Sequence, residues 1–179
     1  MNKKVLWITE TAVLIALLVV VQFVTKSFGQ LVTGSCVNLL LAVAAIVGGL
    51  WCGVTVAAIS PFLAWMLGIG PSVIQIVPMI AIGNIVFVVL IYFLVGKLMK
   101  DMSFKSYALG VLGTAISAFV KFGVLWLLIV KLMLPMLTLA EKQVSMMSAM
   151  FAWPQLFTAL IGGGIALIVA PMLRKALKR

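Results

Sequence analysis

The hydrophobic positions of this chain come in long runs that are separated by a few polar, Gly or Pro residues. Within a run the apolar residues are nearly continuous and do not alternate with polar ones, as they do in the strands of a membrane barrel. A helix of roughly 20 apolar residues crosses the hydrocarbon of a bilayer. The pattern therefore predicts six transmembrane helices, at about 5–25, 34–50, 53–68, 73–98, 106–133 and 147–173.

These spans and their short turns use the whole length of 179 residues, so we expect one membrane domain, 1–179, in an all-α integral membrane protein. The first run follows Lys3 and Lys4, as the core of a signal peptide also does. It is long for such a core and has no clear small-residue cleavage site, so we interpret it as a retained first helix.

The composition restricts the chemistry of the chain. Sixty-five per cent of the residues are hydrophobic, there is no histidine, and the acidic residues are Glu10, Asp101 and Glu141. A nucleophile–base pair, a metal site or a carboxylate relay needs side chains that this chain lacks. Cys36 and Cys52 lie in apolar runs, where inert thiols are common. We therefore expect no enzyme, no metal and no cofactor.

Basic residues predict the orientation in the membrane. With six spans both termini share one side, and the basic residues on that side are Lys3, Lys4, Lys97, Lys100, Lys105, Arg174, Lys175, Lys178 and Arg179. The other side has Lys26, Lys131 and Lys142. The excess predicts cytoplasmic termini. The net charge of +10 then reflects topology, and we expect no nucleic-acid partner.

Polar side chains within the predicted spans are unevenly distributed. Asn38, Gln75, Asn84, Lys121 and Gln155 all fall in the outer half of the membrane or near its midplane. The inner half has few comparable groups. This asymmetry predicts a pocket that opens outward and is closed toward the cytoplasm.

Lys121 is the most informative of these residues, because a lysine near the bilayer centre costs a few kcal/mol and normally faces protein or water. No carboxylate lies at a matching depth in the sequence. An anionic or carbonyl-bearing ligand is one possible partner. The alternatives are that Lys121 extends toward the interface or binds backbone carbonyls.

The amides also have two interpretations. Asn84 either contacts a ligand or joins two helices, which is a common use of buried Asn. Asn38, Gln75 and Gln155 either contact a ligand or are hydrated near the interface.

Trp153 either anchors its helix at the interface or stacks on a ligand ring. Gln30, Thr33 and Ser35 are ordinary residues of the first outer loop unless that loop folds over the pocket.

Small residues lie four apart on the first predicted helix, at Ala12 and Ala16. This spacing allows another helix to approach closely, either within the same chain or in a partner. Gly110, Ala118 and the glycines at 162–164 have the same ambiguity, and we expect them to serve packing within the chain.

The chain resembles the S component, the substrate-binding membrane subunit, of energy-coupling factor (ECF) transporters. The resemblance includes the size, the six predicted helices, the cytoplasmic termini and the basic C-terminal end. Ala12 and Ala16 match in kind and position the small-residue string with which that family docks on its coupling subunit. The stretch from Thr33 to Pro71, with its Gly-Gly turn and the Ser60–Phe62 sequence SPF, is also similar.

The resemblance implies a high-affinity subunit for a vitamin or related micronutrient in the bacterial plasma membrane. It implies a membrane coupling subunit and two cytoplasmic ATPases as partners, so that ATP hydrolysis belongs to those ATPases. A cationic, thiamine-type substrate needs a buried carboxylate, and a metal ion needs histidines. Lys121 instead favours an anionic or carbonyl-rich heterocycle, held by Asn38, Gln75, Asn84, Trp153 and Gln155 as well.

Two other classes of membrane protein remain open. A small scaffold protein of the cell-shape type would bind no ligand and would use the polar cluster for packing. A channel or secondary carrier would need polar groups in both halves of the membrane.

Overall fold

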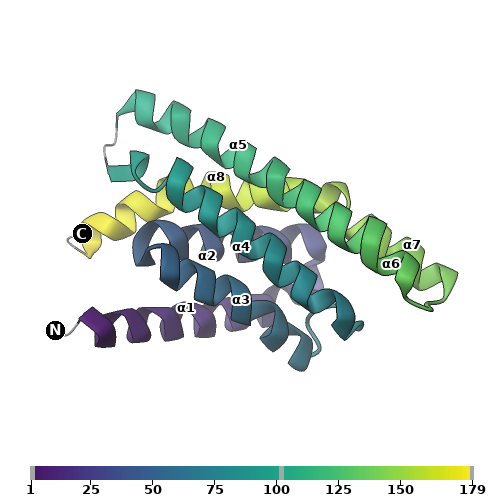
Figure 1. The fold of residues 1–179 in the computed structure, drawn as a ribbon. Helices are drawn as coiled ribbons and strands as arrows, with labels where there is room; N and C mark the ends of the chain where they lie inside the picture. Colours follow the sequence, from purple (N-terminus) through teal and green to yellow (C-terminus); the bar gives the residue numbers. More distant parts are fainter. Residues whose placement is uncertain (1–2, 101–102, 178–179) are drawn as a thin grey trace.

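The computed structural model describes residues 3–100 and 103–177, and its regular structure in these ranges is entirely helical (Figure 1). Asp101, Lys178 and Arg179 lie outside the described residues, as do the side chains of Lys3 and Lys100. The α-helices are α1 (Lys3–Thr25), α2 (Gln30–Val43), α3 (Leu50–Met66), α4 (Val77–Leu94), α5 (Phe104–Leu125), α6 (Leu134–Met136), α7 (Glu141–Met150) and α8 (Trp153–Ala176).

Two π-helical segments lengthen these elements. Ala44–Gly48 continues α2, and Trp126–Met133 joins α5 to α6. Five of the resulting helical stretches are long and apolar enough to cross a membrane, whereas α3, with 17 residues, is shorter. At 1.5 Å per residue α3 spans about 25 Å, somewhat less than the hydrocarbon thickness. The prediction of an all-helical integral membrane protein is confirmed, with a shorter apolar helix in place of one predicted span.

The N-terminal end of α2 differs from the prediction for a local reason. Gly29 adopts φ +84°, a backbone conformation that residues other than glycine rarely adopt. The helix restarts directly after it, so Gln30 and Thr33 lie in the first turn of α2 and not in a loop. The carbonyl of Thr25 accepts a hydrogen bond from Thr33 Oγ1 at 2.8 Å, which ties this turn to the end of α1.

The last predicted helix, 147–173, is divided in two. α7 includes residues 141–146, which the sequence analysis placed in a loop, and α8 begins at Trp153 with Pro154 in its first turn. Proline has no N–H and cannot bond to the carbonyl four residues earlier, which is that of Met150. Gln155 Nε2 donates to this carbonyl instead, at 3.2 Å. The break is therefore a consequence of Pro154, compensated by the next side chain.

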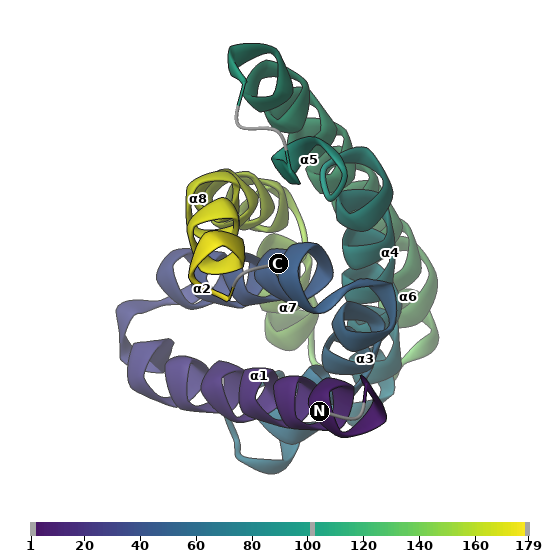
Figure 2. The ribbon, with the colours of Figure 1, turned by 90° about the vertical axis from the view of Figure 1, so that its left-hand side faces the viewer.

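α2 lies inside the bundle, between α1 and α8, as the view along the helices shows (Figure 2). It packs most extensively on α8, while α4 packs between α3 and α5. Glycines allow the closest approaches. A Cβ at Gly162 of α8 would come within 2.6 Å of Leu39 N and 2.7 Å of Asn38 Cβ on α2. The surface of the bundle remains rich in exposed apolar side chains, as expected for a protein surrounded by lipid.

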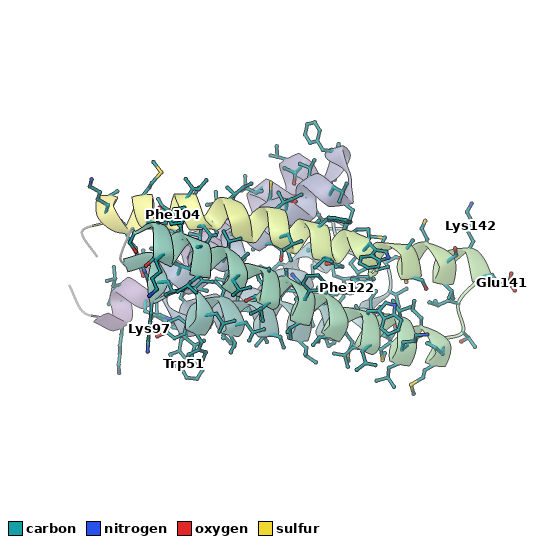
Figure 3. All side chains as sticks on the ribbon, turned by 90° about the horizontal axis from the view of Figure 1, so that it is seen from above. Trp51, Lys97, Phe104, Phe122, Glu141 and Lys142 are labelled. Atoms are coloured by element: carbon teal, nitrogen blue, oxygen red, sulfur yellow. The ribbon has the colours of Figure 1, made fainter. Side chains whose placement is uncertain are left out.

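The start of α1 and the end of α8 lie at the same end of the bundle (Figure 1). Trp51, Lys97 and Phe104 are at this end, and Glu141 and Lys142 are at the opposite end (Figure 3). Arg174, in the last turn of α8, donates to the backbone carbonyls of Gly96 (2.9 Å) and Ile46. These carbonyls belong to helix ends that lack intrahelical partners, so Arg174 connects three elements at this end.

Candidate functional site

A cavity of about 160 Å³ lies between the helices, from the middle of the bundle toward the end remote from the termini. It is lined by the second half of α1, the first half of α2, the end of α3, the loop at 69–71, α4, α5 and the α7–α8 junction. Its polar lining residues are Gln22, Gln30, Thr33, Asn38, Ser60, Asn84, Lys121 and Gln155.

Lys121 is the centre of this site. Its side chain is 2% exposed, and Nζ donates to Asn38 Oδ1 at 2.5 Å and to Asn84 Oδ1 at 2.8 Å. The Phe87 ring lies 5.1 Å from Nζ, at a distance suited to a cation–π contact. Lys121 therefore neither reaches the interface nor binds backbone carbonyls. It joins α5 to α2 and α4 through two neutral amides.

The two asparagines are held differently. Asn38 Nδ2 donates to Gly34 O at 2.8 Å and to Thr158 Oγ1 at 3.2 Å, so both ends of its amide are bonded. Thr158 Oγ1 donates in turn to Gln155 O at 3.1 Å. Among the described residues Asn84 has only the bond to Lys121. Asn38 is thus part of a fixed network, whereas the amino group of Asn84 remains available.

The amine of Lys121 has no acidic partner in the cavity. Of the acidic residues, Glu10 and Glu141 are described, and neither lines it. No group of three or more His, Cys, Asp or Glu side chains in the described ranges could hold a metal ion. The site offers a cation, amides and hydroxyls for binding, and no pair of groups for acid–base chemistry.

Four of the six predicted binding residues line this cavity, namely Asn38, Asn84, Lys121 and Gln155. The structure does not bring the other two to it. Gln75 is exposed in a short 3₁₀ turn (Ile74–Ile76) whose buried side chain is Ile76. Trp153 is 62% exposed and stacks on Phe122, with ring centroids 5.5 Å apart, so its ring is on the outside of the bundle.

Two further polar residues of the cavity, Gln22 and Ser60, were not predicted from the sequence. Both are buried, and Gln22 Oε1 and Ser60 Oγ have no hydrogen-bond partner among the described residues. The available signals were a lone amide in the apolar run of α1 and a Ser-Pro pair within α3. Gln30 and Thr33, which were open alternatives, enter the cavity because α2 begins at Gln30.

Ala12 and Ala16 lie on an exposed face of α1, while Thr11 and Leu18 are buried on the other side of this helix. The two alanines therefore do not serve packing within the described part of the chain. In contrast, Gly110, Ala118, Gly162 and Gly163 are buried between helices, as expected, whereas Gly164 is half-buried and faces open space.

Residues 7–174 match the family model described as "ECF transporter, substrate-specific component". The match covers nearly the whole chain, which therefore belongs to this family, and the resemblance inferred from the sequence is confirmed. No curated protein and no solved structure matches the chain. Members of the family are membrane transport subunits, which bind substrate and work with a membrane coupling subunit and ATPases. This membership favours the transport interpretation over a scaffold protein.

Proposed function

We propose that the chain is the high-affinity binding subunit of an ECF-type importer for a vitamin-like micronutrient, and that it binds this substrate in the cavity around Lys121. The single observation that carries the proposal is a buried lysine, on the wall of a cavity, with neutral partners only. We further propose that the substrate is an anionic or carbonyl-rich heterocycle.

Electrostatics favours an anionic substrate. A buried charge that is not matched by an opposite charge is expensive, even when neutral dipoles solvate it. An anion that enters the cavity gains a charge-assisted hydrogen bond to Lys121 and removes the imbalance. Neither effect is available to a cationic ligand.

The orientation follows from the distribution of basic residues, which favours cytoplasmic termini in a bacterial plasma membrane. Because the cavity lies toward the end remote from the termini, it then faces outward and captures substrate from outside the cell. Release inside requires the subunit to be reoriented by its partners, which are a coupling subunit and two cytoplasmic ATPases. The chain itself does not hydrolyse ATP.

The exposed face of α1 around Ala12 and Ala16 is the proposed docking surface for the coupling subunit, since small residues allow two helices to approach closely. We expect Ala12→Leu or Ala16→Leu to abolish uptake in cells and to leave substrate binding by the purified subunit unchanged. Ala108→Leu is the matched control, because it adds the same bulk at an exposed position of α5. Normal uptake by both α1 variants would exclude this face as the docking surface.

Native mass spectrometry of the chain, purified from its own cells in mild detergent, tests the proposed function. We expect a bound small molecule of a few hundred daltons or less, together with coupling and ATPase subunits in part of the sample. A chain that carries neither ligand nor partner subunits would contradict the proposal.

A further inference from the structure

The hydrogen bonds around Lys121 define one pole of a binding site. A lysine ammonium has three N–H donors and no acceptor, so both asparagines must present Oδ1 to it. Two of the three donors are used by these amides, and no third acceptor is found among the described residues. Asn84 Nδ2 also has no acceptor. One N–H of Lys121 and the amide N–H₂ of Asn84 are therefore without an acceptor, and both residues line the cavity.

Two such donors suit the two oxygens of one carboxylate. A single carbonyl oxygen can accept from both donors, but it brings no negative charge to the lysine. The Phe87 ring also lies near Nζ. Its π face is the only acceptor that this side chain offers. The donors at Lys121 and Asn84 thus favour an anion, and a carboxylate offers one oxygen to each of them.

A second group of polar atoms lines the cavity on α1 and α3. Gln22 is within one turn of the end of α1, whereas Lys121 is in the middle of the helical stretch from Phe104 to Met136. Gln22 Oε1 is buried without a donor, and Ser60 Oγ is buried without any partner, yet both residues line the cavity. A buried acceptor without a donor is energetically unfavourable. A ligand N–H or O–H near these atoms would satisfy the Gln22 oxygen.

The size of the cavity limits what can connect the two groups of polar atoms. Its volume of about 160 Å³ is close to the roughly 150 Å³ of an engineered cavity that holds one benzene molecule. Pockets for drug-sized ligands are larger, at about 300–1,000 Å³. One ring, or a chain of similar volume, fills this space.

We infer that the substrate is a compact carboxylate of about single-ring size, with its carboxylate at Lys121 and Asn84 and an N–H or O–H group at Gln22. The inference rests on the proposed function and narrows its substrate class. It assigns binding roles to Gln22 and to the Asn84 amino group, and it favours a single-ring carboxylate over cationic, neutral and multi-ring vitamins.

Asn84→Asp tests the anionic pole. The new carboxylate would lie where Asn84 Oδ1 now accepts from Lys121, so it would neutralise the lysine from within the protein. We expect the variant to bind carboxylates at least about tenfold more weakly and to unfold at a higher temperature without ligand. Gln75→Glu adds the same charge at an exposed position outside the cavity and should change neither property.

The probes are monocyclic aromatic and short aliphatic carboxylates, with and without a hydroxyl or amino group. Each is compared with its own carboxamide and with a two-ring carboxylate. Binding to the purified full chain is followed by the shift in thermal unfolding, and we expect the single-ring carboxylates with a donor group to bind most tightly. Gln22→Leu should remove the advantage of the donor group and retain the preference for carboxylates.

The mass and charge of the ligand that co-purifies with the chain distinguish a failure of the inferred substrate class from a failure of the proposed function. A bound single-ring carboxylate supports both the inferred substrate class and the proposed function. A bound neutral, cationic or multi-ring molecule, or unchanged carboxylate binding by Asn84→Asp, overturns this inference and leaves the proposed function intact. If no ligand co-purifies and no probe binds, this inference fails; if the partner subunits are absent as well, the proposed function itself fails.

Discussion

We expect Lys121→Met to lower the affinity for the substrate by about 1–3 kcal/mol, which corresponds to roughly 5-fold to 150-fold in Kd. Methionine has a similar length and no charge, so it keeps the volume of the side chain and removes the hydrogen bonds to Asn38 and Asn84. The measurement is calorimetric titration of the identified substrate into the purified variant.

Lys131→Met is the control for the loss of a lysine. Lys131 is exposed on the π-helical segment beyond α5, where its Nζ lies 4.8 Å from the centre of the Trp126 ring. We expect wild-type affinity for this variant. If Lys121→Met also bound substrate with wild-type affinity, Lys121 would be a structural residue that only connects α2, α4 and α5.

Gly162→Ala should destabilise the fold by about 2 kcal/mol or more, because its Cβ would collide with the backbone of α2. The contacts include the Ser35 carbonyl oxygen as well as Leu39 N at 2.6 Å, and backbone atoms cannot move aside as flexible side chains do. The α2–α8 interface must then separate, and Asn38, which lies against Gly162, moves with it. The thermal unfolding temperature in detergent measures the first effect, and substrate affinity measures the second.

Gly164→Ala, two residues further along α8, provides the matched control. A Cβ at this position has no heavy atom within 4 Å, so the substitution should be neutral or slightly stabilising through helix propensity. Equal stability of the two variants would show that α2 and α8 do not pack as closely as the structure indicates.

Properties that act along the chain were predictable from the sequence. The long apolar runs predict membrane helices wherever they occur, since each helix satisfies its own backbone hydrogen bonds in lipid. The observed helix boundaries differ from the predicted ones at single residues. Gly29 starts α2 earlier than expected, and Pro154 separates α7 from α8. Both signals were present in the sequence, but the spacing of apolar residues does not reveal them.

Depth in the membrane was also predictable, because it depends on how far a residue lies from the ends of its own helix. It placed Lys121, Asn38 and Asn84 at compatible levels, and in the structure they are bonded to one another. The same argument placed Gln75 and Trp153 at suitable depths, although both face away from the cavity. Depth alone does not determine the direction of a side chain around the helix axis.

That direction was decided by tertiary packing. The helices here are apolar on almost every side, so hydrophobicity indicates no preferred inner face, and the contacts of small residues such as Gly162 and Gly53 set how each helix is rotated. This rotation brings Gln22 and Ser60 to the cavity and leaves Ala12 and Ala16 exposed. The sequence by itself determined the class of protein and the depth of its polar groups. Only the packed structure decided which groups meet, because that depends on contacts between residues far apart in the chain.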